Sequence, residues 1–201
     1  SAARTSFGIK KPFWVQVQRF YGRIKVEKKI KTETAKEYFS RGLFRAQKGD
    51  LDGAIADYTR AIELDSNYVA AWNNRGVVWM KKGELDRSMR DYTEAIILDP
   101  KLADAWNNRG WVRAQRGNTE GAIEDYCEAL RLDRNMVLAW TNRGNARESL
   151  GDLEGAVLDY TRAIECDRKM GFAWNNRGKA LYTRGDLVGA IEDYSRAIDL
   201  D

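Results

Sequence analysis

The stretch Trp-Asn-Asn-Arg-Gly at residues 72–76 decides the fold, because the chain repeats it. The same five residues stand at 106–110 and 174–178, and 140–144 differs only by a threonine in place of the first asparagine. A more distant copy, Tyr-Phe-Ser-Arg-Gly, stands at 38–42, so successive copies lie 34 residues apart. A fixed period of this length is typical of chains that stack copies of one supersecondary unit.

Each copy predicts two helices. A second glycine follows the first by seven residues, and a tyrosine follows the second glycine by nine. An aspartate precedes the tyrosine, a small residue stands four before it and an alanine three after it, a spacing that indicates an amphipathic helix. The second glycine divides the two helices, because glycine adopts the left-handed conformation beyond a helix end without steric cost. The second glycines are Gly49, Gly83, Gly117, Gly151 and Gly185, and the tyrosines are Tyr58, Tyr92, Tyr126, Tyr160 and Tyr194. Predicted N-caps of the second helices are Asp50, Asn118, Asp152 and Asp186.

These features resemble tetratricopeptide repeats over residues 35–201. The resemblance implies an all-α fold, a right-handed α-solenoid of five antiparallel helix pairs. The repeats are expected at 35–68, 69–102, 103–136, 137–170 and 171–201, the last of them incomplete. The sequence departs from the family in keeping the proline after a repeat only at Pro100, and in having arginine where the family has leucine before the first glycine.

These arginines allow two interpretations. Every copy also has an aspartate sixteen residues on, so a basic residue on the first helix faces an acidic residue on the second. We expect an ion pair between the two helices, with the arginine stem supplying the packing of the missing leucine. The alternative is a ladder that binds anions. The pairs are Arg41 and Asp57, Arg75 and Asp91, Arg109 and Asp125, Arg143 and Asp159, and Arg177 and Asp193.

The asparagines of the repeated stretch are candidate peptide-binding residues. The resemblance implies that the first helices line a concave surface and that the residue two before the first glycine faces inward. A carboxamide can both donate to and accept from one peptide unit, so a row of them suits an extended peptide. The alternative is that the asparagines cap or bridge neighbouring helices. The inward residues are Asn74, Asn108, Asn142 and Asn176, and the same two interpretations apply to Asn73, Asn107 and Asn175.

Specificity is expected from inward positions that differ between copies. They are Met80, Trp111, Leu138, Asn145, Phe172 and Tyr182. The apolar members predict pockets for a peptide with hydrophobic anchors. For Leu138 and Phe172 the alternative is burial by the adjacent repeat. The Lys, Asn and Arg pattern of the chaperone-binding carboxylate clamp is missing, so we expect no binding to chaperone tails.

Composition argues against catalysis. The chain has no histidine, which removes the usual nucleophile pairs and histidine-ligated zinc. Its two cysteines, Cys127 and Cys166, form neither a disulfide framework nor a CxxC site, and there is no phosphate-binding loop. We therefore expect a protein that is not an enzyme and has no cofactor or metal. Unpaired cysteines favour the cytoplasm or another reducing compartment, and no apolar run reaches the ~18 residues of a membrane span.

The first 34 residues do not fit the repeat. They carry nine Lys or Arg against two Glu, a net charge of +7, whereas residues 35–201 carry −3. We expect a helix over about 13–32 that caps the first repeat, with 1–11 disordered. The alternative is an adaptor that uses residues 10–31 for weak contact with an anionic membrane or with RNA. The start lacks methionine and a signal sequence, so we expect a fragment or a processed form.

Taken together, the sequence predicts a non-catalytic scaffold that binds a peptide segment of a partner protein in a concave groove. The fifth repeat has no polar capping helix after it, so either more repeats follow in the full protein or this face pairs with another copy. The main alternative function is therefore a self-associating module. That alternative predicts a homo-oligomer formed through the exposed C-terminal repeat.

Overall fold

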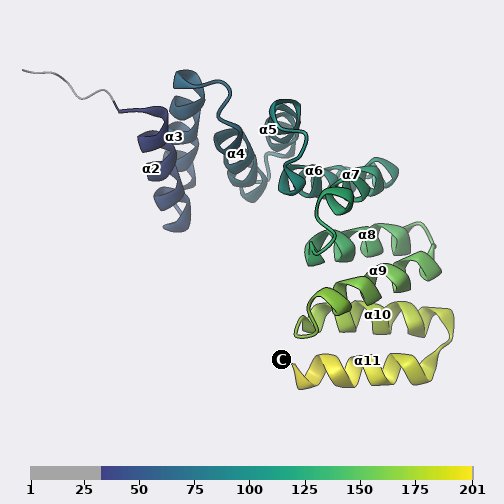
Figure 1. Cartoon of the computed structure of the whole chain (residues 1–201). Coiled ribbons are helices and arrows are strands. Elements are labelled where there is room, and N and C mark those ends of the chain that lie inside the picture. The colour runs from purple at the N-terminus through teal and green to yellow at the C-terminus, as the bar shows by residue number, and fades with distance from the viewer. Residues whose placement is uncertain (1–32, 201) are drawn as a thin grey trace, which may run out of the picture. The chain divides into compact units, whose positions relative to one another are not determined.

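The computed structural model describes residues 33–200, and within them it contains ten α-helices in antiparallel pairs (Figure 1). Residues 34–201 form one compact unit. The predicted helix over 13–32, its capping role and the disorder of 1–11 lie outside the described residues. The first helices of the repeats are α2 (Ala35–Gln47), α4 (Val69–Lys81), α6 (Ala103–Gln115), α8 (Val137–Ser149) and α10 (Gly171–Arg184). The second helices are α3 (Leu51–Leu64), α5 (Leu85–Leu98), α7 (Thr119–Leu132), α9 (Leu153–Cys166) and α11 (Leu187–Asp199).

The predicted breaks between the paired helices are confirmed. All five second glycines have positive φ, from 78° at Gly83 to 93° at Gly185. In four repeats the side chain after this glycine caps the second helix, as where Asp50 accepts a hydrogen bond from the Gly53 N–H at 2.9 Å. The second repeat differs, because Glu84 precedes α5 and makes no such bond.

Each helix pair closes around a tyrosine. A Cβ atom placed on Gly110 would lie 2.8 Å from Tyr126 Cε1, which leaves no room for a side chain there. Tyr126 itself is 1% exposed, and Ala122 and Ala129 on the same helix are fully buried. The first glycine, the tyrosine and the small residues are therefore required together for the close approach of α6 and α7. No helix among residues 33–200 has the length and apolar character needed to cross a bilayer.

Neighbouring repeats share apolar clusters. Ala95 and Ile96 at the end of α5 pack with Ala105 at the start of α6, and Trp72 and Trp106 border this cluster. Each second helix contacts the first helix of the next repeat, and each first helix also contacts the next first helix. Within the described residues no two second helices contact each other. The first helices therefore lie closer together and line the concave side of the stack, which is where the candidate residues were expected.

Candidate functional site

The repeated arginines form the predicted ion pairs. Arg109 donates through Nε and Nη2 to the two carboxylate oxygens of Asp125 at 2.9 and 2.7 Å. Asp125 is only 1% exposed, and Arg113 adds a second cation at 3.0 Å. The same bidentate ion pair recurs in the other four repeats. Because these guanidinium groups are bound within the helix pairs, the structure supports the ion-pair interpretation over a ladder of arginines that binds anions.

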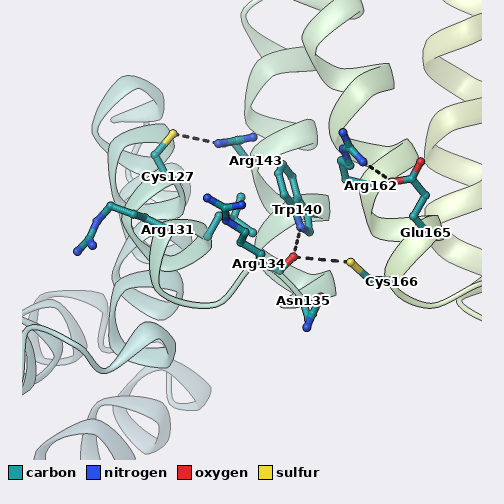
Figure 2. A pocket seen from close by; sticks show the side chains of 10 residues that line it. Cys127, Arg131, Arg134, Asn135, Trp140, Arg143, Arg162, Glu165 and Cys166 are labelled. Carbon is teal, nitrogen blue, oxygen red and sulfur yellow. Dashed lines mark hydrogen bonds and ion pairs between the residues drawn. The ribbon is translucent and has the colours of Figure 1, made fainter.

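The same arginines also join successive repeats. Arg143 lies over the Trp140 ring, 4.8 Å from its centroid, and donates through Nη1 to the Cys127 sulfur of the preceding repeat at 3.1 Å (Figure 2). Arg75 and Arg177 make the equivalent bond to a threonine hydroxyl. Burial alone lowers the pKa of Arg143, but the hydrogen bond and charge of Asp159 outweigh it and raise that pKa above its ordinary value.

An outer pocket of about 630 Å³ surrounds this junction of the third and fourth repeats (Figure 2). Four arginines line it, but Arg131 pairs with Glu128 at 2.8 Å and Arg162 pairs with Glu165 at 2.7 Å. With Arg143 bound to Asp159, three of the four charges are already compensated. The pocket therefore has little unbalanced charge with which to hold an anion.

The inward asparagines partly bridge neighbouring repeats. Asn142 donates through Nδ2 to Asn107 Oδ1 at 3.1 Å, and Asn107 donates to Asn108 Oδ1 at 3.4 Å. Asn176 donates to Asn145 Oδ1 of the preceding repeat at 3.1 Å. Some of the hydrogen-bonding capacity of the row is therefore used within the protein.

The burial of the first asparagine of the stretch differs between repeats. Asn107 is 7% exposed, and Asn73 has a buried Oδ1 without a hydrogen-bond partner among the described residues. Asn175 in the last repeat is exposed. Asn74 is half-buried, and its side chain makes no hydrogen bond within residues 33–200. Its carboxamide, with the free N–H groups of Asn108, remains available to a ligand.

Three predicted residues meet in one pocket on the concave side. Trp111 from α6 and Asn142 and Asn145 from α8 line a space of about 250 Å³ together with Tyr126 and Ser149. The Trp111 indole N–H has no partner within the described part of the chain. The pocket thus combines an aromatic wall with two carboxamides.

A polar network holds one edge of this pocket. Tyr160 Oη donates toward Asn145 Oδ1 at 2.7 Å and Glu148 Oε2 at 3.0 Å, and Lys179 pairs with Glu148 at 2.8 Å. Burial and the Glu148 carboxylate raise the pKa of Tyr160, which keeps its hydroxyl protonated as a donor. Asn145 is therefore held in place from two repeats, by Tyr160 and Asn176.

The other predicted apolar residues lie outside this pocket. Leu138 and Tyr182 are 54% and 62% exposed, so Leu138 is accessible rather than covered by its neighbour. Met80 is half-buried, and its sulfur accepts a weak bond from Tyr92 Oη at 3.9 Å. Phe172 is 43% exposed and lies with Asn175 in a pocket of about 660 Å³ on the last repeat.

Sequence reasoning missed a pocket in the second repeat. It has a volume of about 520 Å³ and is lined mainly by Trp72, Arg75, Trp79, Arg87, Met89 and Arg90. A signal was present in the sequence, because residues 79 and 87 break the repeat. The corresponding residues are arginine and glycine in the first, third and fourth copies.

Comparison with known families agrees with this architecture. A family model described as TPR repeat matches residues 42–83 and 112–151. Three further models, each described as tetratricopeptide repeat, match 69–102 and 172–201, 91–124, and 137–170. No curated protein matches the chain in sequence.

Several solved structures share the fold. The structure of MamA protein is 24% identical, covers 84% of this chain and 92% of its own, and has a TM-score of 0.74. YrrB, described as a TPR protein with an unusual peptide-binding site, is 23% identical over 90% of this chain and 92% of its own, with a TM-score of 0.68. The pilF protein of Pseudomonas aeruginosa is 20% identical over 83% and 76%, with a TM-score of 0.77. With the family models, the helix pairs and the 34-residue period, this places the chain in the tetratricopeptide repeat family.

Proposed function

We propose that the chain is a non-catalytic interaction module that binds an extended peptide segment of a partner protein along its first helices. The observation that carries the proposal is the concave pocket in which Trp111 lies beside Asn142 and Asn145. The similar structure of YrrB, described as having a peptide-binding site, supports a role of this kind.

The pocket suggests how a peptide is held. A space of about 250 Å³ accepts one apolar side chain, which contacts the Trp111 ring. The free amide groups of Asn74 and Asn108 then pair with the peptide backbone, because a carboxamide offers both donors and an acceptor. Hydrogen bonds to the peptide backbone supply affinity that does not depend on the peptide's side chains, and the Trp111 pocket supplies selectivity for one of them.

The test compares two pairs of asparagines. A peptide library is screened against the wild type, an Asn74→Ala/Asn108→Ala variant and an Asn135→Ala control in an exposed loop. We expect the double variant to lose at least tenfold in affinity, about 1.4 kcal/mol, and to melt near the wild-type temperature. An Asn107→Ala/Asn142→Ala variant should lose stability as well, because it removes the bridge between repeats. Equal binding by the wild type and the Asn74/Asn108 variant contradicts the proposal.

Self-association is a second candidate, favoured by the outer face of α11. Ile198 is 76% exposed, whereas its counterparts Ile96, Leu130 and Ile164 are at most 6% exposed under the next repeat. Val188 and Ile191 on the same helix are 71% and 66% exposed. A contiguous apolar surface of this kind is a candidate contact for another protein.

The first repeat does not present the matching surface. Later first helices pack on the preceding repeat through a fully buried alanine, such as Ala71, but α2 has Glu37 at that position. Phe44, 60% exposed, takes the place of Val78 and its small buried counterparts. End-to-end stacking would press a carboxylate and a larger ring against α11. We therefore propose that α11 meets α11 of a second copy about a two-fold axis.

The measurement is mass as a function of concentration by analytical ultracentrifugation. We expect a dimer at high concentration, and only monomer for Ile191→Glu. Leu158→Glu is the matched control, since Leu158 is 65% exposed but lies on α9. Monomer at every concentration for the wild type, or a dimer that Ile191→Glu leaves intact, overturns this candidate.

A further inference from the structure

The second repeat replaces one local arrangement with another. In the first, third and fourth repeats, an arginine near the end of the first helix donates to the carbonyl of a glycine in the second helix, as Arg113 does to Gly121 at 2.9 Å. At the corresponding positions the second repeat has Trp79 and Arg87. The two changes are coupled, because Arg87 now lies over the Trp79 ring, 4.6 Å from its centroid. The second repeat therefore has this arginine on its second helix, whereas the first, third and fourth repeats have it on the first helix.

A third change makes room for this arrangement. Where a glycine is present, its N–H binds the capping side chain, and a Cβ atom there would lie 2.1 Å from the cap, as at Gly53 and Asp50. In the second repeat the residue before α5 is Glu84, which forms no cap, so a long side chain is accommodated at residue 87. The second repeat therefore lacks the stabilising side-chain cap of α5 and has Arg87 in place of the glycine.

The result is the pocket of about 520 Å³ on this repeat. Trp72 and Trp79 are seven residues apart on α4, so they lie on one face of the helix. Asn74 is about 200° around the helix from Trp72, so the pocket faces away from the concave row of asparagines. Trp72, Trp79 and Met89 supply its apolar surface.

The unpaired polar groups of this pocket are mainly donors. Arg90 has no carboxylate within ion-pair distance among the described residues, and Arg87 has only Glu84 at 4.0 Å. The Trp79 indole N–H has no partner in the same part of the chain, whereas the Trp72 indole donates to the Ser66 carbonyl at 2.9 Å. Asp91 is already bound by Arg75, which leaves Glu94 as the one uncompensated carboxylate lining the pocket. Arg90, the weakly paired Arg87 and the indole N–H together outnumber Glu94 around the apolar surface, which fits an acidic ligand with a bulky apolar side chain.

We propose that the Trp79–Arg87 pocket is a second docking site, which binds an acidic segment of a partner protein through one aromatic or large aliphatic side chain. The side chain contacts Trp79 and Met89, and carboxylates flanking it pair with Arg87 and Arg90. Arginine suits this role because its planar guanidinium can bind a carboxylate through two hydrogen bonds. The site is independent of the concave surface and does not rest on peptide binding there.

The probe is a fluorescein-labelled peptide, Asp-Glu-Phe-Glu-Asp, with Asn-Gln-Phe-Gln-Asn as its uncharged counterpart. Binding is followed by fluorescence anisotropy of the labelled peptide. We expect the acidic peptide to bind the wild type at least tenfold more tightly than its counterpart, with an affinity that falls as salt rises. Arg90→Ala should lower the affinity several-fold.

The decisive variant is Trp79→Arg/Arg87→Gly, which introduces the arginine and glycine of the first, third and fourth repeats. It should fold, because three repeats of this chain already use that pair. We expect it to lose at least tenfold in affinity for the acidic peptide, while Asn74→Ala/Asn108→Ala binds as the wild type does. If the double variant shows reduced helicity by circular dichroism, Arg90→Glu takes its place. Undiminished binding by the folded variant, equal binding of the uncharged peptide, or no binding to the wild type at millimolar peptide overturns the proposal.

Discussion

At the scale of single residues, every repeat contains an ion pair between its two helices that includes a buried aspartate. Each aspartate before the conserved tyrosine is between 1% and 4% exposed, and its carboxylate binds one or two guanidinium groups. Such a pair stabilises the fold little more than an apolar pair of the same size would, but removing one partner leaves a buried charge without its counter-ion. The identity of both residues is therefore tightly constrained in every repeat.

The first prediction concerns Asp125. Asp125→Ala should lower the free energy of unfolding by about 3–5 kcal/mol, because the partly buried Arg109 and Arg113 both lose their carboxylate partner. Urea unfolding followed by circular dichroism measures the change. Asp52→Ala is the control, since its ion pair with Lys82 is exposed and should contribute less than about 1 kcal/mol. Similar losses for the two variants would show that burial does not set the cost.

The second prediction concerns the buried tyrosines at alkaline pH. Burial, with a smaller effect of Asp57, raises the pKa of Tyr58 from 10.0 to about 12. The stability due to the neutral phenol is complete below pH 10 and is lost as the pH rises toward the folded pKa. In that window Tyr58 should lower the free energy of unfolding by about 1.4 kcal/mol per pH unit.

Tyr58→Phe removes this ionisation. Its urea midpoint should therefore fall less steeply than that of the wild type between pH 10 and 12, while both are flat between pH 7 and 9. Parallel curves through the alkaline range would contradict the assignment.

At the scale of helices, contact across each pair depends on the first glycine. A Cβ atom on Gly110 would meet both Tyr126 and the Ala122 carbonyl oxygen, at 2.8 and 3.1 Å. Only the tyrosine can move, and it is packed among buried residues, so α6 and α7 would have to separate. The distance between paired helices is thus set by a single missing side chain.

The third prediction compares two glycines. Gly110→Ala should destabilise the protein by about 1–3 kcal/mol through overpacking. Gly171→Ala should be neutral or stabilise it by up to about 1 kcal/mol, because its Cβ would have no neighbour closer than 3.5 Å and alanine favours the helix. Thermal unfolding of both variants measures the difference. Destabilisation by Gly171→Ala equal to that by Gly110→Ala would contradict the steric explanation.

At the scale of the whole molecule, stability comes from contacts between neighbouring repeats. Helix α7 buries six residues between its own pair and the next repeat, whereas α11 buries only Ala190 and Asp193. Each repeat contacts only its neighbours, and among the described helices α11 contacts α10 alone.

The fourth prediction is a gradient of hydrogen exchange. Backbone amides in α11 should exchange at least tenfold faster than those in α7, since α11 opens locally without disturbing the rest of the stack. Mass spectrometry of peptides from the two helices measures the rates at low protein concentration, where self-association is minimal. Equal protection of α7 and α11 would show that the stack unfolds as a single unit.

The sequence alone determined the helix pairs, the breaks at the second glycines and the ion pairs between residues sixteen apart. These features arise within one repeat, where spacing of 3.6 residues per turn and the stereochemistry of glycine suffice. Their fivefold recurrence made each of them visible without a structure. The missing leucine before the first glycine was likewise explained by the aspartate in the same repeat.

Only the tertiary structure decided which polar groups are free. Asn107 and Asn108 are adjacent and alike in sequence, yet Asn107 is buried at the junction with the next repeat. Whether Asn142 faces a ligand or bridges to Asn107 depends on how two repeats approach, which no spacing within one repeat specifies. The Trp79–Arg87 pair was present in the sequence as two unconnected irregularities. Folding brings them together across two helices, and the pocket exists only because side chains from both helices surround the same space.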